Sequence, residues 1–215
     1  MTDPLISQDA IDLIVREEDS DKAYYEKHYT HFEWPEGASG PTIGIGYDCG
    51  YVTQAEAEKD WEGIVSEETI AAIKRACGIK GEAAHQWVRA HGGSVTITWD
   101  EAMLEFTTRE VPKWVSRVKA YLKNTDKLSP TSLGALVSLA YNRGAGVFVD
   151  PGARYAEGRA IRAHMAAGNF AAIPHDILSM QRLWPRGGDL WRRRAHEAAL
   201  FDKGLQRTVN ESSGA

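Results

Sequence analysis

The stretch PTIGIGYDCG, residues 41–50, places two glycines between a hydroxyl and a carboxylate. Side chains alternate along a strand, so a straight strand would put Thr42, both glycines and Asp48 on one face. Glycines there remove the side chains that would keep a bulky ligand away from the backbone. Because six residues of straight strand span about 20 Å, Thr42 and Asp48 can serve one bond only if the chain bends near Gly46. The alternative is a glycine-rich hairpin with an aspartate in its turn.

The segment before this stretch predicts an amphipathic helix. In QDAIDLIVREE, residues 8–18, the apolar stripe consists of Ile11, Ile14 and Val15, and Glu18 lies one turn further along it. A carboxylate on an apolar helix face costs free energy to ionise. A carboxylic acid that keeps its proton near neutral pH can protonate the leaving oxygen of a sugar. The alternative is a salt-bridged glutamate at the end of a helix.

The remaining sequence predicts an α+β fold that is mostly helical. Capping boxes are expected at Thr53–Glu56 and at Thr98–Glu101, and a capped start is expected at Ser129–Pro130. The expected helices cover residues 54–64, 67–77, 81–91, 99–123 with a kink at Pro112, 130–143, 155–167, 170–182 and 189–202, before a frayed tail. The segment 130–143 is apolar nearly all round, so it should be the buried centre of a helical lobe. The core is expected to contain Leu133, Leu136, Val137, Leu139, Ala140 and Phe148.

Composition and charge narrow the class of protein. The chain has 215 residues, 43% hydrophobic residues and a formal charge of −5, which fits a soluble globular protein with one domain or two lobes sharing a helix. The charge argues against a nucleic-acid binder, although Arg182, Arg186 and residues 192–194 make the carboxy-terminal third basic. We expect no signal peptide and no membrane-spanning segment, and therefore synthesis in the cytoplasm. We also expect a monomer.

Cysteine and histidine spacing gives no sign of a cofactor. Cys49 and Cys77 have neither metal-ligand nor redox spacing and are expected to be free thiols. The seven histidines form no HExxH motif, and no serine-hydrolase elbow or phosphate-binding loop is present. We therefore expect no metal and no cofactor.

Four motifs in this order resemble phage-type lysozymes: an acid closing the first helix, TIGIGY, ALVSLAYNRGAGVF (135–148) and DLWRRRAHEAALF (189–201). These enzymes are muramidases that cut the β-1,4 bond between N-acetylmuramic acid and N-acetylglucosamine. The resemblance covers the first 50 residues and most of 97–203. It implies one lysozyme-like domain, residues 1–215, with a small lobe at about 18–60, inserted helices at about 54–92 and a helical lobe at about 97–205.

The resemblance implies a role for several residues. Glu18 matches the catalytic acid of the family, and Thr42 matches its threonine. Arg193, in the RRxxE pattern, looks like the arginine that pairs with the catalytic glutamate, and Asn142 matches a position that lines the sugar cleft. Trp34, Tyr47 and Tyr51 are expected either to stack on sugar rings or to pack the small lobe, with Tyr47 taken as substrate-binding.

The second acid departs from the usual pattern. Typical members carry an aspartate between the first helix and the threonine. In this chain the corresponding segment, EKHYTHFEWPEGASGP (residues 26–41), contains glutamates but no aspartate. The pesticin-like bacteriocin and effector branch instead places an aspartate shortly after the threonine. Asp48 fits that branch, as does the long spacing from Glu18 to Thr42, and Glu26 is the reserve candidate.

These features predict a peptidoglycan hydrolase acting in the periplasm or cell wall after release or delivery, either as an endolysin or as an antibacterial effector. Its expected partners are peptidoglycan glycan strands and, for an effector, an immunity protein. Two alternatives share the motifs. A lytic transglycosylase would use Glu18 without a second acid, and a peptidoglycan-binding module would not be catalytic.

Overall fold

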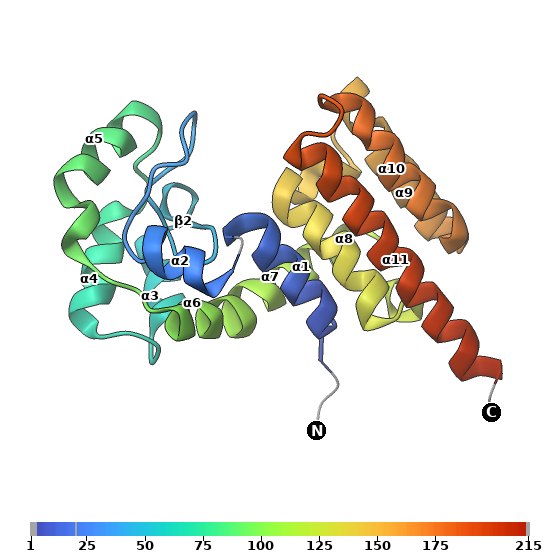
Figure 1. The fold of residues 1–215 in the computed structure, drawn as a ribbon, viewed down its shortest axis with the longest axis horizontal. Coiled ribbons are helices and arrows are strands. Elements are labelled where there is room, and N and C mark those ends of the chain that lie inside the picture. The colour runs from blue at the N-terminus through green and yellow to red at the C-terminus, as the bar shows by residue number, and fades with distance from the viewer. Residues whose placement is uncertain (1–3, 20, 214–215) are drawn as a thin grey trace. The chain divides into compact units, whose positions relative to one another are not determined.

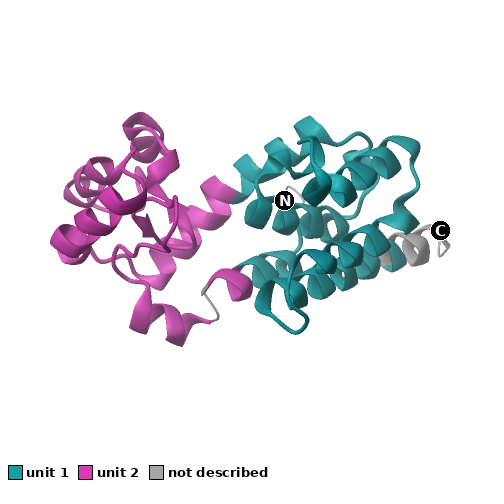
Figure 2. Ribbon diagram, turned by 90° about the horizontal axis from the view of Figure 1, so that it is seen from above, with its two compact units in different colours: residues 1–14, 111–215 teal, residues 15–110 magenta. Residues whose placement is uncertain are grey.

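The chain passes between two compact units at Ile14–Val15 and at Glu110–Val111, and both points lie in helical segments. The first unit combines Met1–Ile14 with Val111–Ala215, and the second is Val15–Glu110 (Figure 2). The computed structural model describes residues 4–19 and 21–213. The predicted small lobe and inserted helices fall entirely in the second unit, whereas the predicted helical lobe begins before the boundary at Val111.

The first unit is built around one apolar helix, α8 (Pro130–Arg143). The hydroxyl oxygen of Ser129 caps it by accepting a hydrogen bond from the amide of Ser132, and Pro130 occupies its first turn, as predicted. Every residue from Thr131 to Ala140 is buried. The prediction of the core is confirmed, because all six expected residues are at most 5% exposed: Leu133, Leu136, Val137, Leu139, Ala140 and Phe148.

The helices that pack on α8 are the start of α1 (Gln8–Asp19), α7 (Val111–Tyr121) and α11 (Asp189–Ser213), which runs alongside α8 in Figure 1. The helix α10 (Ile173–Ser179) packs on α11, and α9 (Ala156–Ala167) packs on α10. Gly134 allows the closest approach, because a Cβ atom added there would lie 2.2 Å from the Cβ of Ala10 on α1. Small residues thus bring these two helices into backbone contact.

The second unit consists of short helices around a two-stranded sheet (Figure 1). Its elements are the end of α1, α2 (Lys22–His28), β1 (Thr42–Ile43), β2 (Tyr47–Asp48), α3 (Gln54–Trp61), α4 (Glu67–Ala76), α5 (Gly81–His91) and α6 (Trp99–Glu105). Both predicted capping boxes are present, with Thr53 and Glu56 on α3 and with Thr98 and Glu101 on α6. The chain is therefore mostly helical with a small antiparallel sheet.

The hairpin bends where its glycines lie. The strands pair antiparallel with Thr42 opposite Asp48 and Ile43 opposite Tyr47, so the straight strand considered from the sequence is not formed. Gly44 and Gly46 have φ angles of +63° and +69°, which side-chain-bearing residues rarely adopt. The bend brings Thr42 and Asp48 to facing positions.

Two predicted helices are divided into shorter elements in the structure. Residues 99–121 contain a π-helical turn at Phe106–Glu110, just before Pro112. The ring of a helical proline clashes with the carbonyl four residues earlier, here Thr108, and a wider turn relieves that clash. The segment predicted at 170–182 is α10 between two short 3₁₀ turns, Phe170–Ala172 and Met180–Leu183.

The frayed tail is a wrong prediction. The last helix, α11, continues to Ser213, and Gly214 and Ala215 lie outside the described residues. The helix still packs on α8 beyond residue 202, because the carbonyl of Gly204 accepts a hydrogen bond of 3.1 Å from the Ser129 hydroxyl. A Cβ atom at Gly204 would lie only 2.2 Å from the hydroxyl oxygen of Ser132. Among the described residues, no helix has the length and apolar character needed to cross a membrane.

Candidate functional site

A pocket of about 440 Å³ in the second unit brings together residues from the end of α1, from the segment 29–36 and from the hairpin. Its lining residues are Glu18, Tyr29, His31, Glu33, Trp34, Pro35, Glu36, Thr42, Ile43, Gly44 and Gly46. Pockets that hold small ligands have volumes of roughly 300–1,000 Å³. Glu18 and Thr42, which the resemblance pairs, line this pocket together with both hairpin glycines.

The segment 29–36 forms one wall of the pocket by pairing with β1. The amide of Glu33 donates to the carbonyl of Thr42 at 2.9 Å, and the amide of Thr42 donates to the carbonyl of Glu33 at 2.8 Å. Phe32 is buried and packs edge-on against Trp87, with ring centroids 5.1 Å apart. Side chains alternate along extended backbone, so the burial of Phe32 directs His31 and Glu33 to the other side.

The polar side chains of the wall are fixed by backbone groups. Nδ1 of His31 lies 2.6 Å from the carbonyl oxygen of Val95, and because a carbonyl only accepts, this nitrogen carries the proton. The indole of Trp34 donates to the carbonyl of Ser39 at 3.2 Å, and the ring stacks on His85 with centroids 4.5 Å apart.

Glu18 and Thr42 are both half-buried. The hydroxyl of Thr42 lies 3.3 Å from the carbonyl of Gly40, to which it donates. Gly44 and Gly46 present backbone without a side chain to the same pocket. A carboxyl group, a hydroxyl and open backbone thus line one pocket.

Asp48 supports the hairpin and is not among the residues that line the pocket. Its Oδ1 accepts hydrogen bonds from the amides of Gly40, at 2.9 Å, and Gly50, at 2.8 Å. Burial raises the pKa of Asp48, while these two amides and the charge of Lys80 oppose the rise. Its role as a second acid stays a prediction.

Sequence reasoning missed Glu33 and Glu36, which supply the other carboxylates of the pocket. Glu33 is exposed and pairs through its backbone with Thr42, so it is a second candidate for the second acid. The available signal was the alternation His31, Phe32, Glu33, in which one apolar side chain separates two polar ones. The reserve candidate, Glu26, is exposed, pairs with Lys22 at 3.7 Å and is not a lining residue.

Tyr47 is a wrong prediction as a sugar-stacking residue, because its side chain is only 2% exposed. Its ring packs edge-on against Trp61, and its hydroxyl donates to Oδ2 of Asp60 at 2.9 Å. Burial, followed by the charge of Asp60 and the hydrogen bond to it, raises the pKa of Tyr47 well above its usual range. Tyr47 therefore packs the interior of the unit, which is the alternative that the sequence left open.

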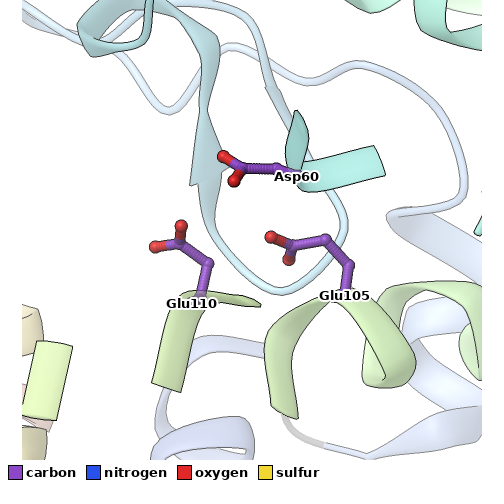
Figure 3. Close-up of side chains that lie close together, drawn as sticks. All are labelled: Asp60, Glu105 and Glu110. Atoms are coloured by element: carbon purple, nitrogen blue, oxygen red, sulfur yellow. The ribbon is translucent and has the colours of Figure 1, made fainter. Parts of the chain in front are cut away.

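Asp60 belongs to a group of three carboxylates with Glu105 and Glu110 (Figure 3). One oxygen from each lies within 4.8 Å of the others, and Asp60 and Glu105 are buried while Glu110 is half-buried. The three side chains point toward one another from α3, from the last residue of α6 and from the last residue of the π-helical turn. An all-oxygen set of this kind suits a hard cation such as Ca²⁺ or Mg²⁺. Acidic residues also gather without an ion, so we assign no metal to the group.

Asn142 and Arg193 belong to the first unit. Oδ1 of Asn142 accepts a hydrogen bond of 3.1 Å from Arg194. Arg193 is buried and lies 3.2 Å from the carboxylate of Glu197, which also pairs with Arg194 at 3.0 Å and accepts from the hydroxyl of Ser138 at 2.8 Å. Burial raises the pKa of Glu197 against the opposing effect of the two arginines. The roles of Asn142 in a sugar cleft and of Arg193 toward the catalytic acid stay predictions.

Comparison with known proteins gives one informative match. No curated protein matches the chain. A family model described as Domain of unknown function (DUF8812) matches residues 13–138, which is more than half of the chain. The matched segment contains Glu18, Thr42 and Asp48 and ends before Asn142 and Arg193. The chain therefore belongs to the family of domains described as DUF8812.

Proposed function

We propose that the protein is a muramidase of lysozyme-like fold that hydrolyses the β-1,4 bond between N-acetylmuramic acid and N-acetylglucosamine. The observation that carries the proposal is that Glu18 and Thr42 line one pocket of about 440 Å³. The resemblance pairs these two residues as catalytic acid and threonine. Peptidoglycan glycan strands are the proposed substrate, met in the periplasm or cell wall after release or delivery.

Glu18 acts as the general acid in this mechanism and protonates the glycosidic oxygen as the sugar bond breaks. The hydroxyl of Thr42 positions the attacking water. Gly44 and Gly46 let the glycan lie against the hairpin backbone, and the Trp34 ring offers an apolar surface at the side of the same pocket. In addition, a second carboxylate must either activate this water or stabilise the positive charge that develops on the sugar.

Two carboxylates are candidates for this second role. Asp48 lies opposite Thr42 in the hairpin and matches the pesticin-like branch, but its Oδ1 already accepts two backbone hydrogen bonds. Glu33 lines the pocket itself. Asp48→Asn and Glu33→Gln separate the two, because the variant that loses hydrolysis identifies the second acid, provided that its urea unfolding curve is unchanged.

The decisive experiment is digestion of purified peptidoglycan followed by mass analysis of the soluble products. We expect Glu18→Gln to lower the rate by roughly 10²–10⁴-fold, the contribution of a general acid. The matched control is Glu17→Gln, which changes the neighbouring glutamate in the same way and should keep the parental rate. If Glu18→Gln releases products at the parental rate, the assignment of the acid and the proposed mechanism are wrong.

One observation favours a second candidate function, a lytic transglycosylase. The hydrogen bonds from Gly40 and Gly50 to Asp48 give that carboxylate a structural role, and a transglycosylase needs only the acid. The product masses decide between the two enzymes, because hydrolysis adds a water to each cleaved bond and transglycosylation leaves an anhydro sugar. An endolysin or an antibacterial effector fits either activity, and an effector would bind an immunity protein.

A further inference from the structure

A second cavity, in the first unit, is lined by positively charged side chains that have no role in the proposed glycan cleavage. It has a volume of about 480 Å³, and its lining residues are Lys119, Ala120, Tyr121, Leu122, Lys123, Phe148, Arg159, Arg162, Ala163 and Ala166. Four of these are cations and none is an acid. This local excess of positive charge stands on a chain whose formal charge is −5.

The cations come from two segments of the chain. Lys119 lies in the last turn of α7 and Lys123 in the turn that follows this helix, and Arg159 and Arg162 are three positions apart on α9. Like charges at the spacing of the two arginines repel and destabilise a helix slightly. Lys119 also balances the negative end of α7, but this explanation does not extend to the arginines of α9. A bound anion would relieve the repulsion between the cations that line the cavity.

Hydrogen bonds to backbone carbonyls fix part of the cavity. The amide nitrogen of the Asn124 side chain donates to the carbonyl of Met165 at 2.9 Å, which ties the segment after α7 to the end of α9. The guanidinium of Arg159 donates to the carbonyls of Asp150, at 2.6 Å, and Gly152, at 3.0 Å, and is held in place. Lys119, Lys123 and Arg162 form no ion pair with a carboxylate among the described residues.

The apolar part of the lining limits the class of ligand. Leu122 and Phe148 are buried side chains that form part of the lining, and Ala163 and Ala166 add small apolar side chains to it. A ligand that fits has a compact carbon-rich body and an anionic group that several cations can reach. Arginine binds phosphate through two parallel hydrogen bonds, and lysine binds it as a point charge. The C–H surfaces of a sugar or a short unbranched polyol can lie against this apolar lining, with the hydroxyl groups left in solvent, while a phosphate ester on the same molecule reaches the cations.

We propose that this cavity binds the phosphate ester of a sugar or polyol. Such a group occurs on soluble phosphorylated polyols and their polymers and also in the headgroup of phosphatidylglycerol. The site is separate from the pocket that contains Glu18 and is tested by binding alone. Failure of this proposal therefore leaves the proposed glycan cleavage untouched.

The experiment is calorimetric titration of the full chain with glycerol 3-phosphate, with uncharged glycerol as the ligand control. Lys119→Gln/Arg162→Gln removes two cavity cations, and Lys127→Gln/Arg186→Gln removes one exposed lysine and one exposed arginine elsewhere in the same unit. We expect glycerol 3-phosphate alone to bind, and the cavity variant to weaken binding about tenfold, the effect of losing charge-assisted hydrogen bonds. The control variant should bind like the parent.

A second variant tests the cavity itself. Ala163→Phe keeps every charge but fills the space, so it should weaken binding as strongly as the loss of the two cations. No binding to the parent protein at about 10 mM glycerol 3-phosphate, or equal weakening in the cavity and control variants, would overturn the proposal. Unchanged binding by Ala163→Phe would also overturn it, because the cations would then act without the cavity.

Two further arms identify the source of the phosphate. Vesicles of phosphatidylglycerol, compared with vesicles of phosphatidylcholine, test the lipid headgroup, and retention by the former that depends on Lys119 and Arg162 assigns that source. Binding of glycerol 3-phosphate without vesicle retention assigns a soluble polyol phosphate. A single-stranded oligonucleotide that binds more tightly than glycerol 3-phosphate and competes with it would contradict the proposal in favour of nucleic acid.

Discussion

In the first unit the central helix, α8, is buried over ten successive residues from Thr131 to Ala140, whereas the second unit holds its hairpin with hydrogen bonds from buried and half-buried polar groups. Asp48 fixes the base of the hairpin through Gly40 and Gly50, and Tyr47 fixes its second strand through Asp60. The first unit also buries polar groups, because Ser138 of α8 and two arginines of α11 contact the carboxylate of Glu197. The two units therefore differ in their central elements: a long buried helix in the first, and in the second a short hairpin fixed by individual side-chain hydrogen bonds. The unit with the hairpin also contains the pocket with Glu18 and Thr42.

The largest effect is expected from shortening a large buried side chain of α8 in the first unit. Leu136 is fully buried in α8, so Leu136→Ala should lower the free energy of unfolding by about 2–5 kcal/mol. The measurement is urea unfolding followed by circular dichroism. Leu190→Ala is the matched control, because Leu190 is 38% exposed on α11, and it should change stability by less than about 0.5 kcal/mol. Equal losses in the two variants would remove α8 from the centre of the core.

A smaller effect is expected from one hydroxyl in the second unit. Tyr47→Phe keeps the ring but removes the donor to the buried carboxylate of Asp60, so it should cost about 1–3 kcal/mol of stability. The matched control is Tyr51→Phe, because the Tyr51 hydroxyl also donates, to the carbonyl of Ala38, but from a side chain that is 63% exposed. If both variants cost the same, buried hydrogen bonds do not set the stability of this unit.

The stability that the Tyr47 hydroxyl contributes should fall as the pH rises, and the same two variants test this. The pKa of Tyr47 in the folded protein is raised above its ordinary value of 10.0, so the unfolded chain releases this proton first as the pH rises. Stability contributed by the protonated hydroxyl is complete below pH 10 and is lost progressively above it. The parent should therefore lose stability more steeply above pH 10 than Tyr47→Phe does. Tyr51→Phe should follow the parent.

The sequence predicts well what neighbouring residues determine. The capping boxes at Thr53 and Thr98 join residues three positions apart, and the core of α8 follows from an apolar run, so both could be identified without knowing the fold. The burial of Tyr47 also had a signal in the alternation of the hairpin, which the prediction of a substrate-binding Tyr47 overlooked. With Thr42 and Asp48 on one face, Ile43, Ile45 and Tyr47 point to the other, and all three are buried.

What the sequence could not predict depends on contacts between distant segments. Asp60, Glu105 and Glu110 meet only because α3 packs near the π-helical turn, and no spacing rule connects them. Glu33 enters the pocket because its backbone pairs with Thr42, nine residues later and across an irregular loop. The continuation of α11 past residue 202 depends on Gly204 packing against α8, which local helix signals do not record.

The smallest effect concerns two thiols of the second unit and leaves stability unchanged. Cys49 is buried and Cys77 is half-buried, and both are free, as predicted. Burial, with a contribution from the charge of Glu56, raises the pKa of Cys77 to about 11. The thiolate is the reactive form, and at pH 8 only about a thousandth of the Cys77 side chains should be thiolates. Alkylation of Cys77 should then accelerate about tenfold with each pH unit up to pH 10.

The measurement is mass analysis of peptides after timed treatment with iodoacetamide in the absence of denaturant. Cys49 should stay unmodified over the same period, because burial both raises its pKa and excludes the reagent. Cys77→Ser is the control that removes the expected signal. A rate for Cys77 that levels off near pH 9 would mean that its thiol is solvated. Modification of Cys49 as fast as that of Cys77 would mean that the hairpin opens readily, and the polar contacts of Asp48 and Tyr47 would then not hold the second unit closed.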